Sequence, residues 1–586
     1  MNLFADVEAR VLAALAALKA EGKLPADLAL DGVEIQEPRD PAHGDMATNA
    51  ALVLAKRAGK KPREIADLLA GKLKGAEGIA KVDVAGPGFI NLALAPSVWQ
   101  GLVADILKAG DSYGRTSIGK GQRVNVEYVS ANPTGPMHVG HTRGAVFGDA
   151  LANLLAFAGY AVTREYYVND AGAQVDKLAR SALLRYREAL GETIGEIPPG
   201  LYPGEYLKPI GAALAKTHGK ALLAKPEAEA VAIARAATIT TLLAEIKDDL
   251  AQLGVKHDLF VSERSMTEGP RDKIKAAVDT LRAKGLIFEG RLPRPKGHGE
   301  DEWEDREQTL FRSTAFGDDM DRALMKSDGT YTYFAGDVGY HLDKLERGFD
   351  HYFNVLGADH VGYIPRLKAV VKALSDGKAS YETPVCQLVK VLRNGEPVRM
   401  SKRAGSFVAL RDVVDEVGRD PVRFMMLYRK NDSPLDFDLA KVVEQSKDNP
   451  IFYVQYAHAR AASIFRNAPA AIPGFDAEAI RTGKVDLTRL TDPGEIDLIK
   501  QLAKFPRLIE SVARDREPHR VPFYLFELAS AFHQQWNRGN DSPHLRFIQA
   551  DDPGLSDARL GLVAALQQVI SSGLALLGVH APVEMR

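Results

Sequence analysis

The sequence predicts an α/β protein: a doubly wound parallel-sheet domain, preceded by a small α/β domain and followed by an all-helical bundle. A strand–helix–strand pattern occupies residues 122–168, and this is the repeating unit of a doubly wound sheet. Residues from 448 onward show only helical periodicity. At 586 residues, the chain also exceeds the size that one hydrophobic core supports.

The first domain is expected to span residues 1–115. Residues 1–23 carry apolar side chains at spacings of three and four, interrupted by acids, which predicts an amphipathic surface helix and not an export segment. The positions of glycine and proline, and the alternation of apolar and polar residues, predict the other elements of this domain. These are helices at residues 45–56 and 62–73, strands at 82–84 and 89–94, and a glycine-rich linker at 110–121.

The second domain is expected at residues 116–447. Val124, Val126 and Tyr128 alternate as in a half-buried strand. A helix rich in small residues follows and ends before Gly159, a typical left-handed cap. The remaining predictions are a helix at residues 139–158, a strand at 162–168, a helical insertion with connecting material at about 171–325, and further strands at 350–357 and 385–392.

The third domain, residues 448–586, is predicted to be a helical bundle. Asn449 is a suitable N-cap, and Pro450 suits the first turn of a helix. Apolar residues then recur at helical spacing, which indicates one buried face per helix. They are Val454, Ala457, Ala461, Ile464 and Phe465.

Composition sets limits on the function. The chain is 46% hydrophobic and 26% charged, which is typical of an ordered soluble protein. Its net charge of −2 means that any contact with nucleic acid must use a local basic face. Cys386 is the only cysteine, so no intrachain disulfide can form, and we expect a reducing cytoplasm. No run of 18 apolar residues occurs, so we expect no membrane span.

The segment at residues 131–141 carries two histidines near the predicted start of a helix. His138 and His141 share a helix face, so both imidazoles can donate hydrogen bonds to one phosphate group. The helix N-terminus adds partial positive charge, and Gly140 allows close approach of a flat ring such as adenine. A metal site is the alternative, but no further His/Cys cluster stands nearby to complete it.

A second motif, Met400-Ser401-Lys402-Arg403, lies in a basic loop. The Lys402 ammonium has three donors that suit a developing polyphosphate, and Gly405 lets the loop close over a nucleotide. Alone, the stretch is typical of a solvated basic loop. Together with the two histidines, in this order, it favours a nucleoside triphosphate site.

These two motifs resemble the signatures of class I aminoacyl-tRNA synthetases, and nearly the whole chain resembles the bacterial-type arginyl-tRNA synthetase family. The first position of the second signature is Arg399 where the wider class has lysine, which keeps the charge. The resemblance implies a Rossmann-like catalytic domain. It is carried by residues 127–136, 143–149 and 166–172 around the first signature, 44–49 and 86–91 in the extra N-terminal domain, and 453–460 in the anticodon-binding bundle.

The resemblance implies an activity: activation of L-arginine with ATP to arginyl-adenylate, then transfer of arginine to the 3′ end of tRNA(Arg). His138, His141 and Lys402 are then the catalytic residues, which stabilise the transition state electrostatically. Mg²⁺ is expected to accompany ATP, with no dedicated protein site. The ATP-binding residues implied are Pro136, Met137, His138, Gly140, His141, Gly357, Asp359, His360, Met400, Ser401, Lys402 and Arg403.

The same resemblance implies where the amino acid and the tRNA bind. A guanidinium needs carboxylate acceptors, and family patterns assign Glu127, Tyr333 and Asp337 to it, with Ser130 and Asn132 at the α-amino end. In the bundle, Tyr453, Tyr456 and Arg460 fall at i, i+3 and i+7, and with Trp536 they are expected to contact tRNA. Such a tyrosine stripe is also typical of core packing.

Three other functions compete with this interpretation. A cysteinyl enzyme of the same class needs thiol-selective zinc ligands, which a single cysteine does not favour. A small-molecule adenylyltransferase shares the histidine signature but needs no helical bundle. A catalytically silent RNA-binding relative is expected to lack a signature residue, and His138, His141 and Lys402 are all present. We expect a monomer, since no heptad seam is evident.

Overall fold

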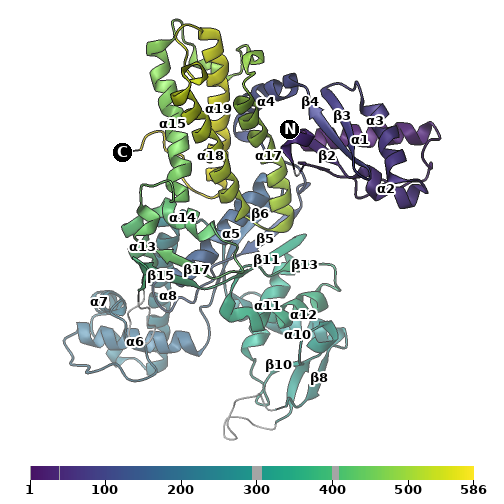
Figure 1. Cartoon of the computed structure of the whole chain (residues 1–586). Coiled ribbons are helices and arrows are strands. Elements are labelled where there is room, and N and C mark those ends of the chain that lie inside the picture. The colour runs from purple at the N-terminus through teal and green to yellow at the C-terminus, as the bar shows by residue number, and fades with distance from the viewer. Residues whose placement is uncertain (1, 39, 294–305, 399–407, 586) are drawn as a thin grey trace.

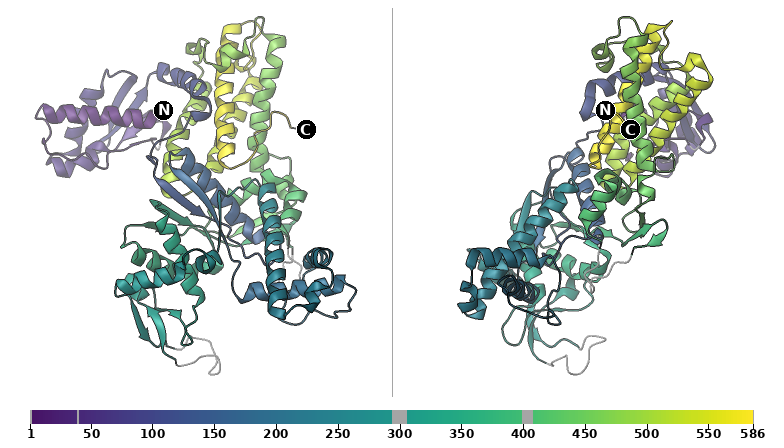
Figure 2. Two further views of the ribbon diagram at one scale, coloured as in Figure 1. Left: turned by 180° about the vertical axis from the view of Figure 1, so that it is seen from behind. Right: turned by 90° about the vertical axis from the view of Figure 1, so that its left-hand side faces the viewer.

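A computed structural model gives the architecture of the protein and describes residues 2–38, 40–293, 306–398 and 408–585. Three parts follow one another: a small N-terminal domain, a central domain, and a bundle of long helices (Figure 1). The small domain lies beside the bundle, and both sit at one end of the central domain (Figure 2).

The small domain contains a four-stranded antiparallel sheet in the order β1-β2-β4-β3. The amphipathic first helix is confirmed, because α1 buries Val7, Val11 and Leu15. The elements are α1 (Leu3–Ala20), β1 (Ile35–Gln36), β2 (Met46–Thr48), α2 (Ala50–Ala58), α3 (Pro62–Leu73), β3 (Ile79–Ala85) and β4 (Phe89–Leu94).

The helix predicted at residues 45–56 is wrong at its start. Residues 46–48 form strand β2, and α2 begins only at Ala50. Pairing of β2 with β4 requires the chain to pass close to Leu92 at Gly44, where a Cβ atom would lie 2.8 Å from the Leu92 carbonyl oxygen. Sheet pairing therefore overrides the local helical pattern, as tertiary context often does.

Helix α4 (Pro96–Ala109) packs against the bundle, although residues up to 115 were predicted to belong to the small domain. The Gln100 amide donates to the carbonyl oxygens of Thr488 and Leu490, both at 3.0 Å. The Tyr113 hydroxyl donates to the Leu502 carbonyl oxygen at 3.0 Å. The segment after Leu94 therefore connects the small domain to the bundle.

The central domain is built on a five-stranded parallel sheet in the order β13-β11-β5-β6-β7. The predicted strand–helix–strand unit is confirmed, since β5 and β6 are parallel neighbours joined through α5. Gly159, with φ +90°, follows the end of that helix as expected. The elements are β5 (Arg123–Glu127), α5 (Val139–Phe157), β6 (Ala161–Val168), β7 (Leu259–Ser262), β11 (His351–Asn354) and β13 (Ser380–Glu382).

The segment predicted as a helical insertion at residues 171–325 is only partly helical. Helices α6 to α8 form a unit with its own apolar core, but β7 then returns to the central sheet, and β8 to β10 make a separate antiparallel sheet. Four-residue strands are too short for periodicity to reveal. The elements are α6 (Ala173–Ala189), α7 (Leu207–His218), α8 (Glu227–Gln252), α9 (Ser265–Glu268), α10 (Lys273–Ala283), β8 (Ile287–Gly290), β9 (Gln308–Phe311) and β10 (Arg322–Met325).

Two predicted strands are each divided in the structure. Residues 350–357 contain β11 of the central sheet and a separate β12, which pairs with β14. Residues 385–392 likewise contain β14 and most of β15. The remaining elements are α11 (Tyr333–Glu346), β12 (Leu356–Gly357), α12 (Ile364–Leu374), β14 (Val385–Cys386), β15 (Val389–Arg393), β16 (Glu396–Pro397), α13 (Leu410–Val417), α14 (Arg419–Leu427) and β17 (Leu435–Asp438).

The helical bundle is confirmed. Helix α19 is long and apolar enough to cross a membrane, but 83% of its most apolar window is buried inside the structure, which is typical of a core helix. One apolar core extends from the small domain through the central domain into the bundle. The helices are α15 (Pro450–Ala471), α16 (Ala477–Arg481), α17 (Pro493–Asp515), α18 (Arg520–Asp541) and α19 (Pro553–Leu576).

Candidate active site at the carboxyl edge of the central sheet

The two signature histidines open helix α5. Their rings stack with centroids 3.9 Å apart. Nδ1 of His138 accepts the backbone N–H of Gly140 at 3.1 Å, and Nδ1 of His141 accepts that of His138 at 3.3 Å. A nitrogen that accepts carries no proton, so each neutral ring carries its proton on Nε2 and can donate from there.

Gly140 makes this arrangement possible. A Cβ atom at this position would lie 2.8 Å from Cε1 of His138, so a larger residue would displace the imidazole that caps the helix. The structure thus adds a local reason for the glycine besides the predicted close approach of a nucleotide ring.

The segment after the second signature is hydrogen-bonded to the first. The backbone N–H of Val139 donates to the Val408 carbonyl oxygen at 3.1 Å, and that of Leu410 donates to the Met137 carbonyl oxygen at 2.9 Å. His138 also forms an antiparallel bridge with Ala409. The chain therefore brings residues 408–410 against the histidine segment, whereas the predicted Met400, Ser401, Lys402 and Arg403 lie outside the described residues.

The turn that follows β5 is strained. Val129 has φ +71° and Ser130 has φ +39°, a region that β-branched residues in particular avoid. Ser130 is held there on both sides: its Oγ accepts the Tyr167 backbone N–H at 3.0 Å, and its carbonyl oxygen accepts the Asn169 amide at 3.3 Å. This turn leads the chain across the carboxyl end of the sheet to Asn132, whose side chain is exposed there.

Two carboxyl groups lie at the start of helix α11. Burial, together with the negative charges of Glu263 and Glu127, raises the pKa of Asp337 to about 7 against the opposing effect of Arg366. Burial also raises the pKa of Glu263, as does Asp170. Glu263 follows β7, and its Oε1 lies 3.5 Å from where a Cβ of Gly336 would stand, so its carboxylate faces the first turn of α11.

Within the part of the chain that the structure describes, neither Asp337 nor Glu263 has a cationic partner within 4.0 Å, so no ion pair neutralises this acidic pair. Tyr333, the first residue of α11, is 68% exposed. Its ring lies 3.3 Å from the position of a Cβ on Gly172, so the motif at residues 166–172 meets the motif at residues 331–337. The arrangement fits a cationic ligand under an aromatic ring.

Glu127, which was expected to contact arginine, has partners of its own. Its Oε2 accepts the Lys344 ammonium and the Tyr340 hydroxyl, the latter at 3.0 Å, and its Oε1 accepts the Ser130 hydroxyl at 3.1 Å. A carboxylate offers about four acceptor sites, so one on Oε1 remains for a ligand.

A second buried acid lies beside Glu127 on the neighbouring strand. The Glu165 carboxylate accepts two hydrogen bonds from Arg347, at 2.6 and 2.9 Å, and one from Tyr340 at 2.5 Å. Burial alone would raise the pKa of Glu165, but Lys344 and Arg347 outweigh it and hold the pKa at about 2. Tyr340 and Lys344 of α11, together with Arg347 at its C-terminal cap, therefore hold that helix against two acids of the sheet.

The predicted nucleotide residues after β12 lie at the same edge. Gly357 ends β12, which packs near α5, and Asp359 and His360 lie in the 3₁₀ turn η6 (Ala358–Tyr363). Both side chains are largely exposed, with His360 Nε2 3.6 Å from a carboxylate oxygen of Asp359. Pro136 is half-buried and Met137 is buried beneath the histidine segment. Among the described residues, no three potential metal ligands converge.

Sequence reasoning missed Glu263, Lys344 and Arg347. Glu263 directly follows β7, and α/β sheets place ligand-binding side chains directly after their parallel strands. The sequence analysis did not predict β7, because it lies between charged helices. Lys344 and Arg347 fall at helical spacing from Tyr340. Only the burial of Lys344 and the half-buried position of Arg347 against Glu165 distinguish them from surface cations.

A second candidate surface lies on the bundle. The Arg460 guanidinium stands 4.4 Å from the Tyr456 ring centroid and 4.9 Å from that of Trp536, and it donates to the Tyr456 hydroxyl at 2.9 Å. It also meets Nδ1 of the buried His533 at 2.7 Å. Tyr456 is exposed, whereas Tyr453 is half-buried against Phe526 and His533. The contact of these residues with tRNA stays a prediction.

Family models match three stretches of the chain. They are the arginyl tRNA synthetase N-terminal domain at residues 5–94, the class I (R) tRNA synthetase catalytic domain at 102–192, and the DALR anticodon binding domain at 454–585. Together with the parallel sheet and the histidine signature, these matches define a class I aminoacyl-tRNA synthetase.

Similar proteins show to which family of class I aminoacyl-tRNA synthetases the chain belongs. Arginine–tRNA ligases of Nitrobacter hamburgensis and Xanthobacter autotrophicus are each 60% identical to this chain; the alignments cover 100% of it and 99% and 100% of those proteins. The Thermus thermophilus arginyl-tRNA synthetase structure matches the whole fold with a TM-score of 0.72 at 22% identity, covering 100% of both chains. The chain belongs to the arginine–tRNA ligase family.

Proposed function

We propose that the carboxyl edge of the central sheet joins L-arginine to tRNA(Arg) in two steps, as an arginine–tRNA ligase does. The acidic pair Asp337 and Glu263 carries the proposal, because two half-buried carboxyl groups with raised pKa values and no cationic partner among the described residues call for a cation.

Arginine fits this acidic pair better than other amino acids. Its guanidinium is always charged and presents several donors in one plane, which two carboxylates at different positions can accept together. Tyr333 covers the guanidinium as an aromatic face. A lysine ammonium reaches both acids less well, which leaves a buried acceptor unpaired and disfavours it. Ser130 and Asn132 hold the α-amino end, and Glu127 contributes its remaining acceptor site on Oε1.

ATP occupies the histidine end of the same edge. His138 and His141 donate from Nε2, and the N-terminus of α5 adds its partial charge, where negative charge grows on the α-phosphate and pyrophosphate. Lys402 joins them from the second signature, with Met400, Ser401 and Arg403. Pro136, Met137, Gly140, Gly357, Asp359 and His360 surround the nucleotide. Mg²⁺ bound to ATP would neutralise phosphate charge, held mainly by phosphate oxygens and water.

The chemistry needs no covalent enzyme intermediate. A carboxylate oxygen of arginine attacks the α-phosphorus of ATP, the bond from this phosphorus to the β-bridging oxygen breaks, and pyrophosphate leaves. A ribose hydroxyl at the 3′ end of tRNA then attacks the arginyl carbonyl carbon, and AMP leaves with the bonding electrons. The enzyme lowers both barriers by positioning and by electrostatic stabilisation.

The bundle holds the anticodon region of tRNA. Tyr456, Arg460 and Trp536 offer stacking faces and a guanidinium, which suit unpaired bases and phosphates, and Tyr453 supports them from within. We further propose that the enzyme acts as a monomer in the cytoplasm, since the sequence has no heptad seam and one cysteine.

ATP–pyrophosphate exchange with each amino acid, with and without total tRNA, tests this function. Exchange is expected with arginine alone, and the pair of conditions tells whether activation needs bound tRNA. Exchange with another amino acid would refute the arginine assignment. Absence of exchange under both conditions would favour an RNA-binding protein without activity.

A further inference from the structure

The α6–α8 unit, which the chain forms between β6 and β7, contacts the histidine segment through Tyr206. Tyr206 directly precedes α7, and its hydroxyl donates to the Thr134 carbonyl oxygen at 2.5 Å. Cζ of its ring lies 3.4 Å from the position of a Cβ on Gly135. Because Thr134 and Gly135 precede His138 by only a few residues, Tyr206 sets the path of the backbone that leads to the first signature histidine.

Tyr206 stands on a rigid support. The buried Arg185 of α6 donates to the Pro203 carbonyl oxygen at 2.9 Å, which holds the turn before Tyr206 against that helix. Helix α7 then packs so closely on α6 that a Cβ on Gly211 would lie 2.4 Å from the carbonyl carbon of Arg185. The three helices also share an apolar core of their own. The position of Tyr206 is therefore fixed by the α6–α8 unit and not by the segment that it contacts.

The same unit makes a second contact with the nucleotide site at the C-terminal end of α8. Asp249, whose side chain is 8% exposed, accepts Nε and Nη2 of Arg411 at 3.0 and 2.7 Å, and Asp248 pairs with the same guanidinium. Burial raises the pKa of Asp249 against the opposing effects of Arg411 and of the Met137 backbone N–H. Arg411 directly follows Leu410, whose backbone N–H donates to the Met137 carbonyl oxygen. Helix α8 therefore holds the start of α13 where it joins the histidine segment.

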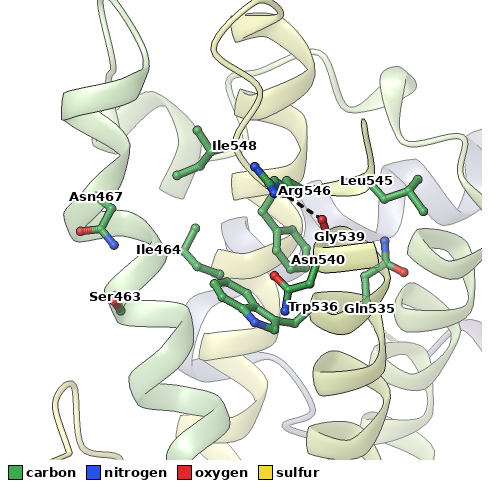
Figure 3. A pocket seen from close by; sticks show the side chains of 11 residues that line it. Ser463, Ile464, Asn467, Gln535, Trp536, Gly539, Asn540, Leu545, Arg546 and Ile548 are labelled. Atoms are coloured by element: carbon green, nitrogen blue, oxygen red, sulfur yellow. Dashed lines mark hydrogen bonds between the residues drawn. The ribbon is translucent and has the colours of Figure 1, made fainter. Parts of the chain in front are cut away.

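The support is separate from the surface proposed to bind tRNA. Helices α6 and α7 lie at the end of the central domain that points away from the bundle (Figures 1 and 2). On the bundle, Trp536 lines a pocket of about 270 Å³ between α15 and α18 (Figure 3). An effect of Tyr206 on catalysis is therefore not an effect on contacts of the bundle with tRNA.

We propose that the α6–α8 unit positions the nucleotide site from two sides. Tyr206 fixes the backbone before His138, and Asp249 fixes, through Arg411, the start of α13 against the histidine segment. Both are positioning residues, and the proposal rests on the ATP-binding role proposed for the histidines. A displacement of about 1 Å in a catalytic group costs roughly 10²-fold in rate, so a small shift of this segment lowers kcat more than it weakens binding.

Amide hydrogen exchange of the full-length chain tests the positioning independently of activity. Tyr206→Phe removes one hydrogen bond and keeps the ring, so peptides from residues 132–141 are expected to exchange roughly fivefold faster than in the wild type. Tyr186→Phe is the matched control, because the Tyr186 hydroxyl donates to the Gly219 carbonyl oxygen at 2.6 Å inside the same unit. It should leave exchange at residues 132–141 unchanged.

ATP–pyrophosphate exchange with arginine, at saturating tRNA, tests the consequence for catalysis. Tyr206→Phe and Asp249→Asn are each expected to lower kcat roughly tenfold with an unchanged KM for arginine. Asp249→Asn combined with Arg411→Met should lose no more than either alone, since the two residues form one contact. Arg411→Lys should restore part of the kcat that Arg411→Met loses. Arg393→Met is the control, because Arg393 pairs at 2.9 Å with Glu416 at the other end of α13.

An unchanged kcat in Tyr206→Phe and Asp249→Asn, or an equal fall in the two control variants, would overturn the proposal while the charging function stands. Equal hydrogen exchange of residues 132–141 in Tyr206→Phe and Tyr186→Phe would overturn it as well. If the wild type activates another amino acid, the arginine assignment fails, and the same variants are compared with that amino acid. If the wild type activates none, the catalytic function fails, and hydrogen exchange alone decides whether the unit fixes the histidine segment.

Discussion

Lys344 on α11 and Glu127 at the end of β5 form an ion pair whose side chains are only 1% and 6% exposed. The pair links α11, which begins at Tyr333 and carries Asp337 one turn later, to β5, the strand that leads into the histidine segment. A buried pair adds little stability by itself, but removal of one partner leaves an uncompensated charge. The contact therefore fixes the position of Asp337 relative to the histidine segment.

Lys344→Met should lower the free energy of unfolding by about 3–5 kcal/mol, because the Glu127 charge then stays buried without its cation. The KM for arginine should rise as the start of α11 moves. Urea unfolding and exchange kinetics measure the two effects. Lys368→Met on the exposed side of α12 is the control and should change stability by less than about 0.5 kcal/mol. Equal stability of the two variants would contradict the role given to the pair.

Arginine binding should depend on pH through Asp337. Its pKa of about 7 without ligand means that the carboxyl group holds a proton below this pH, and a guanidinium must displace that proton. The Kd for arginine should therefore rise by up to tenfold for each pH unit below about 7 and stay level above it. Asp337→Asn should bind weakly with no such dependence. Calorimetry in buffers of different ionisation enthalpy detects the released proton, and a flat wild-type profile would exclude this coupling.

The same pKa has a consequence for folding. Because the folded-state pKa lies above the ordinary value of 3.8, the folded protein keeps a proton that the unfolded chain has lost between about pH 4 and 7. Stability should thus fall across this window relative to Asp337→Asn, as measured by thermal unfolding of both proteins. A constant difference between them would show that Asp337 titrates normally.

His141→Ala should lower the kcat of arginine-dependent exchange roughly 10²–10³-fold with little change in the KM for arginine, because one donor to the developing phosphate charge is lost. The lost hydrogen bond to the His138 backbone should cost only about 1 kcal/mol of stability. His218→Ala, at the end of α7, is the control. An unchanged kcat would remove His141 from the catalytic group.

Arg460→Met should raise the KM for tRNA roughly tenfold and leave kcat at saturating tRNA unchanged, since the guanidinium that binds Tyr456 and lies over Trp536 is lost. Arg466→Met is the matched control on the same helix, because among the described residues the Arg466 guanidinium donates only to the Val583 carbonyl oxygen. Similar tRNA kinetics for both variants would place tRNA elsewhere on the bundle.

The sequence predicted the architecture well where elements are long or chemically marked. The strand–helix–strand unit, the histidine positions and the bundle all follow from periodicity and caps. Strands β7 and β2 were not predicted, because each has only a few residues and each forms by pairing with a strand that is distant in the sequence. Glu263 was not predicted as a site residue because β7 was not predicted, and only its position directly after that strand places its carboxylate at the ligand-binding edge of the sheet.

The candidate site also contains residues whose role depends on burial. Lys344 and Arg347 have the sequence context of surface cations, and only packing of α11 on the sheet turns them into partners of Glu127 and Glu165. Tyr453 and Tyr456 are both tyrosines at helical spacing and both pack on His533, yet Tyr453 is half-buried and Tyr456 is exposed. Periodicity predicts which face of a helix is buried, but it does not predict how much of each side chain on that face the neighbouring helix covers.

The most direct test of the central claim is a crystal structure with a non-hydrolysable arginyl-adenylate analogue. The claim is that one ligand contacts both the acidic pair, Asp337 and Glu263, and the histidine signature. The guanidino group is predicted within hydrogen-bonding distance of Asp337 and Glu263, under Tyr333, with the phosphate mimic at His138 and His141. A guanidino group bound away from both acids, or an adenosine away from the start of α5, would contradict the account.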